Sequence, residues 1–132
     1  MSSHLRGKWE IVSTPLVLIV DDEPGFLRLF SGLVDRLECH SMQASGGAAA
    51  LTILAEETPD LMILDLAMPD VSGLEVLRTV RDTPRLHSMK VMILTARPNM
   101  VPEVEALGID GWVTKPVMAH DFLEAVEKAL AR

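Results

Sequence analysis

The chain has 132 residues, 48% of them hydrophobic, so it can bury one sizeable core and is expected to form a single small domain. Acidic side chains outnumber basic ones by 19 to 12, and no run of Lys or Arg occurs, so direct binding to nucleic acid is not expected. No apolar stretch reaches the roughly 18 residues that span a bilayer. Residues 1–13 lack the apolar centre of a secretory signal, and we expect a cytoplasmic protein with no membrane partner.

The first 13 residues are expected to form an N-terminal extension to a domain that spans residues 14–132. They are polar apart from Trp9, Ile11 and Val12. Two interpretations stay open for them. One is a disordered tail. The other is an arm whose segment 9–12 packs on the domain or on a neighbouring subunit.

Short apolar runs alternate with amphipathic segments along residues 14–132. The predicted strands are 16–20, 39–43, 61–64, 90–94 and 112–114, and the second of these has the weakest pattern. The predicted helices are 26–37, an Ala-rich segment that ends near residue 54, 72–80, 102–107 and 119–130. Ser72 and Glu75 form a capping box at the start of the third helix. The fourth helix is expected to be short or irregular because Pro98 and Pro102 fall in a short connection.

Strands that alternate with helices at this interval pair in parallel through right-handed crossovers. The sequence therefore predicts an α/β fold: a doubly wound, five-stranded parallel sheet with five flanking helices on its two faces. The carboxyl ends of parallel strands lie at the same edge of the sheet, and open α/β folds bind their ligands at that edge.

Four of the predicted strands end on residues suited to phosphoryl chemistry. Asp21 and Asp22 follow the first strand, Asp65 the third, Thr95 the fourth and Lys115 the last. Three neighbouring carboxylates are unfavourable unless a cation or a proton neutralises them. Mg²⁺ suits such a site, because it accepts one or two carboxylates and keeps positions for water and phosphate. An aspartate there can act as a nucleophile and form an acyl phosphate.

Each of these residues also has an ordinary interpretation when taken alone. An aspartate at a strand end often caps a helix, Thr95 could simply end a strand, and Lys115 could be a surface charge. Because independent coincidences would be needed at four strand ends, their joint occurrence favours a phosphoryl site.

Over about residues 14–132 the chain resembles the receiver domain of two-component response regulators. Four motifs in the family's order carry the resemblance: an acidic pair at 20–23, a phosphoacceptor loop at 64–73, a hydroxyl and small pair at 94–96, and a lysine-proline signature at 113–116. The resemblance implies a flavodoxin-like fold and a stand-alone module similar to chemotaxis regulators.

The resemblance also implies the chemistry of the site. Asp65 would accept a phosphoryl group from the phosphohistidine of a sensor histidine kinase or a histidine phosphotransfer protein. Asp22, Asp65 and the carbonyl of Ala67 would bind Mg²⁺, with Asp21 acting mainly through water. Output would pass through contacts with an unidentified downstream protein or through a phosphorelay. The protein would be no enzyme beyond its own phosphoryl transfer and slow autodephosphorylation.

Further residues of the phosphoryl site follow from the same resemblance. Thr95, the amide of Ala96 and Lys115 would bind the phosphoryl group beside the backbone at Ala67, and the Lys115–Pro116 bond would be cis. Thr95 would also act with Trp112 as the conformational switch.

Two departures from the family pattern affect these expectations. Trp112 stands where the family usually has Tyr or Phe, and its larger ring is expected to move only partly or to displace the loop after Thr95. Ala67 and Arg97 occupy the positions two residues after Asp65 and Thr95. Neither side chain carries a carboxylate or a carboxamide to orient hydrolytic water, so a long-lived phosphoryl group is expected.

Three alternatives stay open. The chain could be an excised receiver domain of a larger multidomain regulator. It could be a hydrolase with an aspartate nucleophile, of the haloacid-dehalogenase kind, although that class needs an acid two residues after the nucleophile, where this chain has Ala67. It could also be a pseudo-receiver that binds partners without phosphate.

Overall fold

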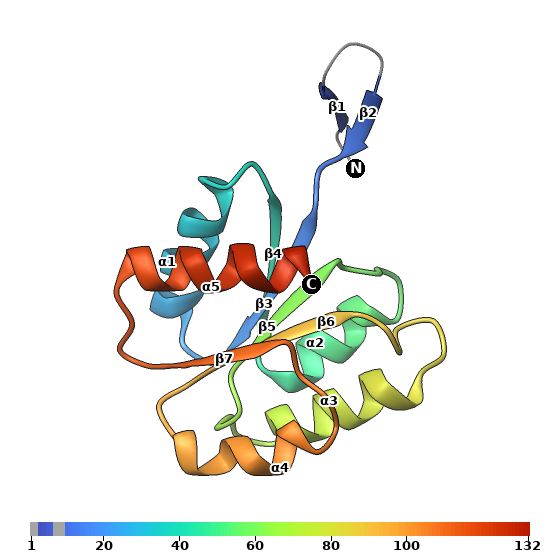
Figure 1. Ribbon diagram of the computed structural model, residues 1–132. Coiled ribbons are helices and arrows are strands. Elements are labelled where there is room, and N and C mark those ends of the chain that lie inside the picture. The colour runs from blue at the N-terminus through green and yellow to red at the C-terminus, as the bar shows by residue number, and fades with distance from the viewer. Residues whose placement is uncertain (1–2, 7–9) are drawn as a thin grey trace.

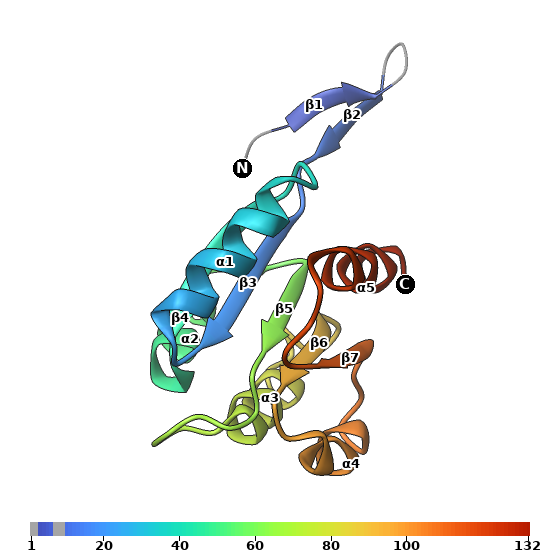
Figure 2. The same ribbon diagram turned by 90° about the vertical axis from the view of Figure 1, so that its left-hand side faces the viewer.

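The computed structural model describes residues 3–6 and 10–132 (Figure 1). Strands β1 (Ser3–Arg6) and β2 (Glu10–Ser13) pair antiparallel in a small sheet of their own. This hairpin stands away from the main body of the protein in Figures 1 and 2. The described part of the extension is therefore a two-stranded hairpin, and Trp9 lies outside the described residues.

A five-stranded parallel sheet forms the centre of the domain. Its strands are β3 (Leu16–Asp21), β4 (His40–Ser45), β5 (Leu61–Leu64), β6 (Lys90–Thr95) and β7 (Gly111–Thr114). They lie in the order β4-β3-β5-β6-β7. The crossovers therefore reverse direction at β3, with β4 on one side of it and β5 on the other. The predicted doubly wound sheet is confirmed.

Strand β4 begins one residue later than the sequence indicated, at His40 rather than Cys39. Glu38 has a left-handed backbone with φ of 57°, which turns the chain just before the strand. The N–H of His40 then donates a hydrogen bond of 2.8 Å to the carbonyl of Pro15, next to β3. Pairing with the neighbouring strand, rather than local composition, sets this boundary.

Five helices flank the sheet: α1 (Pro24–Asp35), α2 (Gly47–Leu54), α3 (Gly73–Asp82), α4 (Val101–Glu105) and α5 (Ala119–Ala131). The Ser72 hydroxyl accepts a hydrogen bond from the Glu75 amide at 3.2 Å, as the capping box predicts. Helix α4 is short, as expected, and follows a single 3₁₀ turn at Pro98–Met100. Among the described residues, no helix has the length and apolar character needed to cross a membrane.

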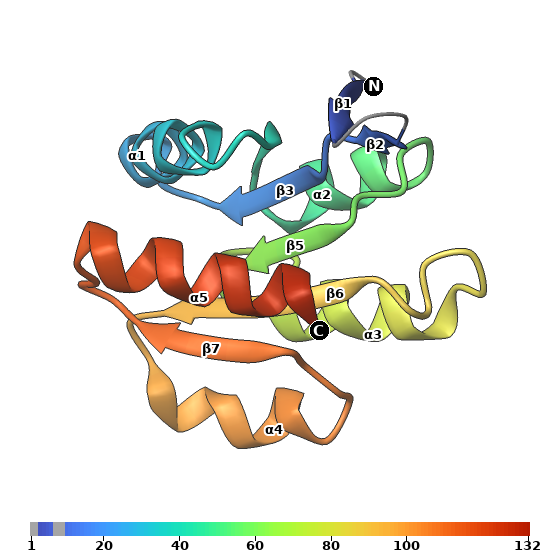
Figure 3. The same cartoon turned by 45° about the horizontal axis from the view of Figure 1, so that its top comes forward.

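Side chains alternate along each strand and build a core on each face of the sheet. Val17 and Ile19 of β3 pack with α1 and α5, whereas Leu18 and Val20 pack with α2, α3 and α4. Figure 3 shows the two layers of helices, with the arrowheads of β3, β5, β6 and β7 all pointing to one edge. The residues that follow these strands therefore meet at that edge.

Two aspartates align the opposite ends of the strands. Asp60, directly before β5, accepts a hydrogen bond of 2.7 Å from the N–H of Leu16 through its carboxylate. Asp110, directly before β7, accepts one of 2.8 Å from the N–H of Val91 in the same way. Each aspartate also donates its own N–H to the carbonyl of that residue. These paired contacts fix the register of β3 with β5 and of β6 with β7.

Gly73 brings the start of α3 against the backbone that follows β5. A Cβ atom at this position would overlap the carbonyl oxygen of Asp65 and lie 2.7 Å from the Cα of Leu66. Both are backbone atoms, which a rotamer change cannot move away. The glycine therefore allows the chain after Asp65 to fold back tightly on itself.

We predict that Gly73→Ala lowers the free energy of unfolding by about 1–3 kcal/mol, because the added methyl overpacks a backbone contact. The matched control is Gly32→Ala, at an exposed position of α1 where a Cβ meets no atom within 4 Å. There alanine should stabilise by roughly 0.5–1 kcal/mol through helix propensity. Urea denaturation measures both variants, and equal stability of the two would contradict the assigned contact.

Candidate functional site

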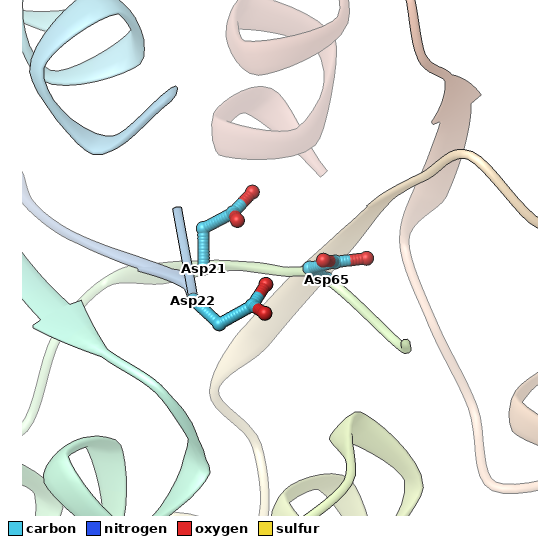
Figure 4. A group of neighbouring side chains, drawn as sticks. All are labelled: Asp21, Asp22 and Asp65. Atoms are coloured by element: carbon cyan, nitrogen blue, oxygen red, sulfur yellow. The ribbon is translucent and has the colours of Figure 1, made fainter. Parts of the chain in front are cut away.

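Three carboxylates meet where β3 and β5 end, at the strand where the crossovers reverse direction. Asp21 is the last residue of β3, Asp22 follows it, and Asp65 comes directly after β5. One oxygen of each lies within 4.8 Å of the others (Figure 4). Asp21 and Asp65 are buried, and Asp22 is closer to the surface. The structure therefore brings together the three acids that the sequence singled out.

A lysine from the far side of the sheet reaches into this acidic group. Lys115 follows β7, and its ammonium lies 2.5 Å from Oδ2 of Asp21 and 3.6 Å from Oδ2 of Asp65. Only 8% of the lysine side chain is exposed. One ammonium cannot neutralise three carboxylates, so the site retains negative charge. A set of hard carboxylate oxygens with excess negative charge fits Mg²⁺.

The balance of charges shifts the acidity of Asp65. Burial raises the pKa of its carboxyl above the ordinary value and is the largest influence. The Lys115 ammonium opposes that shift, whereas the carboxylates of Asp21 and Asp22 add to it. The Ala67 amide donates a hydrogen bond of 3.3 Å to Oδ1 of Asp65 and also lowers the pKa. The pKa of Asp65 is raised overall, so nearby positive charge and hydrogen bonds compensate only part of the cost of burying its charged form.

Backbone contacts join the ends of β6 and β7 beside these acids. Thr95 is fully buried at the end of β6, and its hydroxyl oxygen accepts a hydrogen bond of 3.0 Å from the Arg97 amide. The N–H of Lys115 donates to the carbonyl of Thr95 at 2.8 Å. Ala96 follows at the exposed rim, and the Lys115–Pro116 bond is cis, as the resemblance implied.

Trp112 lies outside the carboxylate group, three residues before Lys115 on β7. Val113 packs with α1 and α5, so the alternation of the strand directs Trp112 to the opposite face. Its side chain is 44% exposed. A conformational change that buries this ring would therefore remove exposed apolar surface.

The comparisons with known proteins agree with this geometry. A family model described as the response regulator receiver domain matches residues 17–127, which include all of these site residues. The chain belongs to the response regulator receiver domain family. It is therefore a receiver domain of two-component signalling.

Several curated and solved proteins are similar to this receiver domain. It is 40% identical over 119 residues to the transcriptional regulatory protein KdpE of Mycobacterium tuberculosis, covering 89% of this chain and 51% of KdpE. It is 29% identical to the polar-differentiation response regulator DivK of Brucella ovis, covering 89% and 97%. The chemotaxis response regulator CheY4 of Vibrio cholerae superposes with a TM-score of 0.83 at 25% identity, covering 89% and 99%. The chain thus spans about half the length of KdpE.

One residue of this receiver site was not predicted. The sequence places Phe26 in the apolar stripe of a helix, yet its ring centroid lies 4.2 Å from the Lys115 ammonium. Its position four residues after Asp22, in the first turn of α1, is the only local signal that points to the site. The lysine that it contacts comes from the opposite end of the chain.

We predict that Asp65→Asn stabilises the metal-free receiver domain at neutral pH. Because the pKa of Asp65 is raised on folding, its charged form is disfavoured relative to the unfolded chain. Stability is then lost as the pH rises from the ordinary aspartate pKa through the raised one. Thermal denaturation should show a higher Tm for Asp65→Asn at pH 7 and no such gain in acid below both pKa values. A lower Tm at pH 7 would contradict the inferred balance of charges.

Proposed function

We propose that Asp65 accepts a phosphoryl group from the phosphohistidine of a sensor histidine kinase or a histidine phosphotransfer protein. The observation that best supports this role is the Lys115 ammonium, which lies beside both Asp21 and Asp65. A buried cation next to a partly compensated carboxylate is the arrangement needed to receive a dianionic group. Family membership supports the class of donor.

In the proposed reaction an Asp65 oxygen forms a bond to phosphorus while the bond from phosphorus to the histidine nitrogen breaks. The imidazole leaves with that electron pair. Thr95, the Ala96 amide and Lys115 bind the phosphoryl oxygens, beside the backbone at Ala67. Asp22, Asp65 and the Ala67 carbonyl would bind Mg²⁺, with Asp21 acting mainly through water. When bound, the ion offsets the negative charge that gathers on the phosphoryl oxygens.

The signal is proposed to persist and to pass onward in the cytoplasm. The side chains of Ala67 and the exposed Arg97 carry no carboxylate or carboxamide to orient a hydrolytic water, which supports slow autodephosphorylation. Output then runs through contacts with a downstream protein or through a phosphorelay, from a receiver domain of residues 14–132 that carries the extension 1–13. Both organisations occur among the relatives, because the matched region makes up 97% of DivK and 51% of KdpE. A stand-alone module is therefore proposed alongside the alternative, a receiver domain that serves a larger regulator.

We predict that acetyl phosphate with Mg²⁺ adds one phosphoryl group to the wild-type protein and none to Asp65→Asn. Asp70→Asn is the matched control, because Asp70 lies exposed in the same loop and outside the carboxylate group, and asparagine tolerates its φ of 63°. This variant should label like the wild type. Intact-mass spectrometry reads the label, and its decay gives the lifetime. Labelling of Asp65→Asn at the wild-type level would refute the assignment.

Trp112 is expected to report activation. In a Trp9→Phe background it is the only tryptophan, and beryllofluoride with Mg²⁺ should shift its emission to shorter wavelength as the 44% exposed ring becomes partly buried or the loop after Thr95 moves. Fluorescence titration measures the change, and Asp65→Asn should show none. An unchanged spectrum, together with unchanged amide shifts over residues 96–112, would mean that this receiver domain signals through another surface.

A further inference from the structure

The Lys115 ammonium has an aromatic neighbour as well as acidic ones. On one side are the carboxylates of Asp21 and Asp65, at 2.5 and 3.6 Å. The ring of Phe26 from α1 also lies close, with its centroid 4.2 Å from the nitrogen. This distance is well within the range of a cation–π interaction. The ammonium therefore contacts two kinds of group, and only the carboxylates carry negative charge.

The Phe26 ring is itself held in place by two further rings. It stacks on Phe30, one turn further along α1, with centroids 5.7 Å apart and an interplanar angle of 9°. Phe30 in turn contacts Phe122 of α5 at 4.7 Å. Phe30 and Phe122 are buried in the core between the sheet and these two helices. The three phenylalanines form a continuous column that ends at Lys115, in which two buried rings lie behind the half-buried ring of Phe26.

A neutral ring suits this position for a physical reason. Lys115 must leave or share Asp21 when a phosphoryl group arrives on Asp65, and another carboxylate behind the ammonium would compete with that group. An aromatic face attracts the cation more weakly than a carboxylate does, and it carries no formal charge. It also occupies space that water would otherwise fill, in keeping with the 8% exposure of the lysine side chain. The ring therefore restricts where the ammonium can go without competing strongly for it.

We propose that Phe26 is a positioning residue, whose ring holds the Lys115 ammonium within reach of the phosphoryl group during transfer to Asp65. The inference rests on the proposed phosphoacceptor function. With acetyl phosphate as donor, an Asp65 oxygen forms the new bond to phosphorus. The bond from phosphorus to acetate breaks, and acetate leaves with the electron pair. Negative charge on the transferring oxygens then faces an ammonium that is already in place, which lowers the cost of reorganisation.

The test compares three variants of the full chain. Phe26→Leu keeps an apolar side chain but removes the aromatic face, and Phe26→Tyr restores that face. Phe30→Leu makes the same change one position down the column, in a ring that is not the one over Lys115. The initial rate of labelling by acetyl phosphate at saturating Mg²⁺ is measured against donor concentration. Two-dimensional NMR follows the ε-methylene shift of Lys115, which the ring current of an adjacent aromatic face moves upfield.

Phe26→Leu should lower the maximal labelling rate about tenfold, the scale of one cation–π contact, and leave the half-saturating donor concentration unchanged. The upfield shift of Lys115 should disappear in this variant. Phe26→Tyr should retain both the shift and a rate within about twofold of the wild type. Phe30→Leu should lower the Tm, but leucine keeps an apolar side chain against Phe26, so this variant should keep the Lys115 shift and the maximal rate.

Two results would overturn the positioning role. One is a wild-type maximal rate in Phe26→Leu despite loss of the Lys115 shift. The other is equal slowing in Phe26→Leu and Phe30→Leu, which would mean that the column acts only through stability. Failure of the proposed function looks different, because the wild-type protein would then take no label at all, although its Lys115 shift would still be present.

Discussion

Repulsion among the carboxylates of Asp21, Asp22 and Asp65 is the constraint on which the rest of the structure depends. One oxygen of each lies within 4.8 Å of the others, two of the three side chains are buried, and a single ammonium offsets only part of their charge. That ammonium comes from Lys115, after the strand at the far edge of the sheet. The site is therefore complete only when β7 has joined the sheet in register, which the contact between Asp110 and Val91 secures.

The negative charge that Lys115 leaves uncompensated at the three carboxylates bears on the proposed function. Burial and acidic neighbours raise the pKa of the Asp65 carboxyl, so its charged form is stabilised when further positive charge comes close. In the proposed function, the same lysine that lies beside Asp21 and Asp65 in this structure also binds the phosphoryl group. In that proposal, the stability predicted for a neutral residue at position 65 is given up for a site that can bind and react.

Lys115 is surrounded by two different kinds of structure. On one side, a 3₁₀ turn and the five-residue α4 follow Thr95, and an exposed Trp112 stands on β7. On the other, the column of Phe26, Phe30 and Phe122 connects the lysine to the buried core under α1 and α5. The site therefore adjoins a packed aromatic column at α1 and a short, irregular segment between β6 and β7.

The sequence by itself determined the sheet, the order of its elements and the acids of the site. Buried parallel strands are unbroken apolar runs, and residues such as Asp21 and Asp65 that directly follow them must meet at one edge. Local patterns could not reveal the contact of Phe26 with Lys115, the tight backbone approach at Gly73 or the late start of β4 at His40. Only the tertiary structure decided these features, because each depends on how segments distant in the chain pack against one another and on which strand pairs with which.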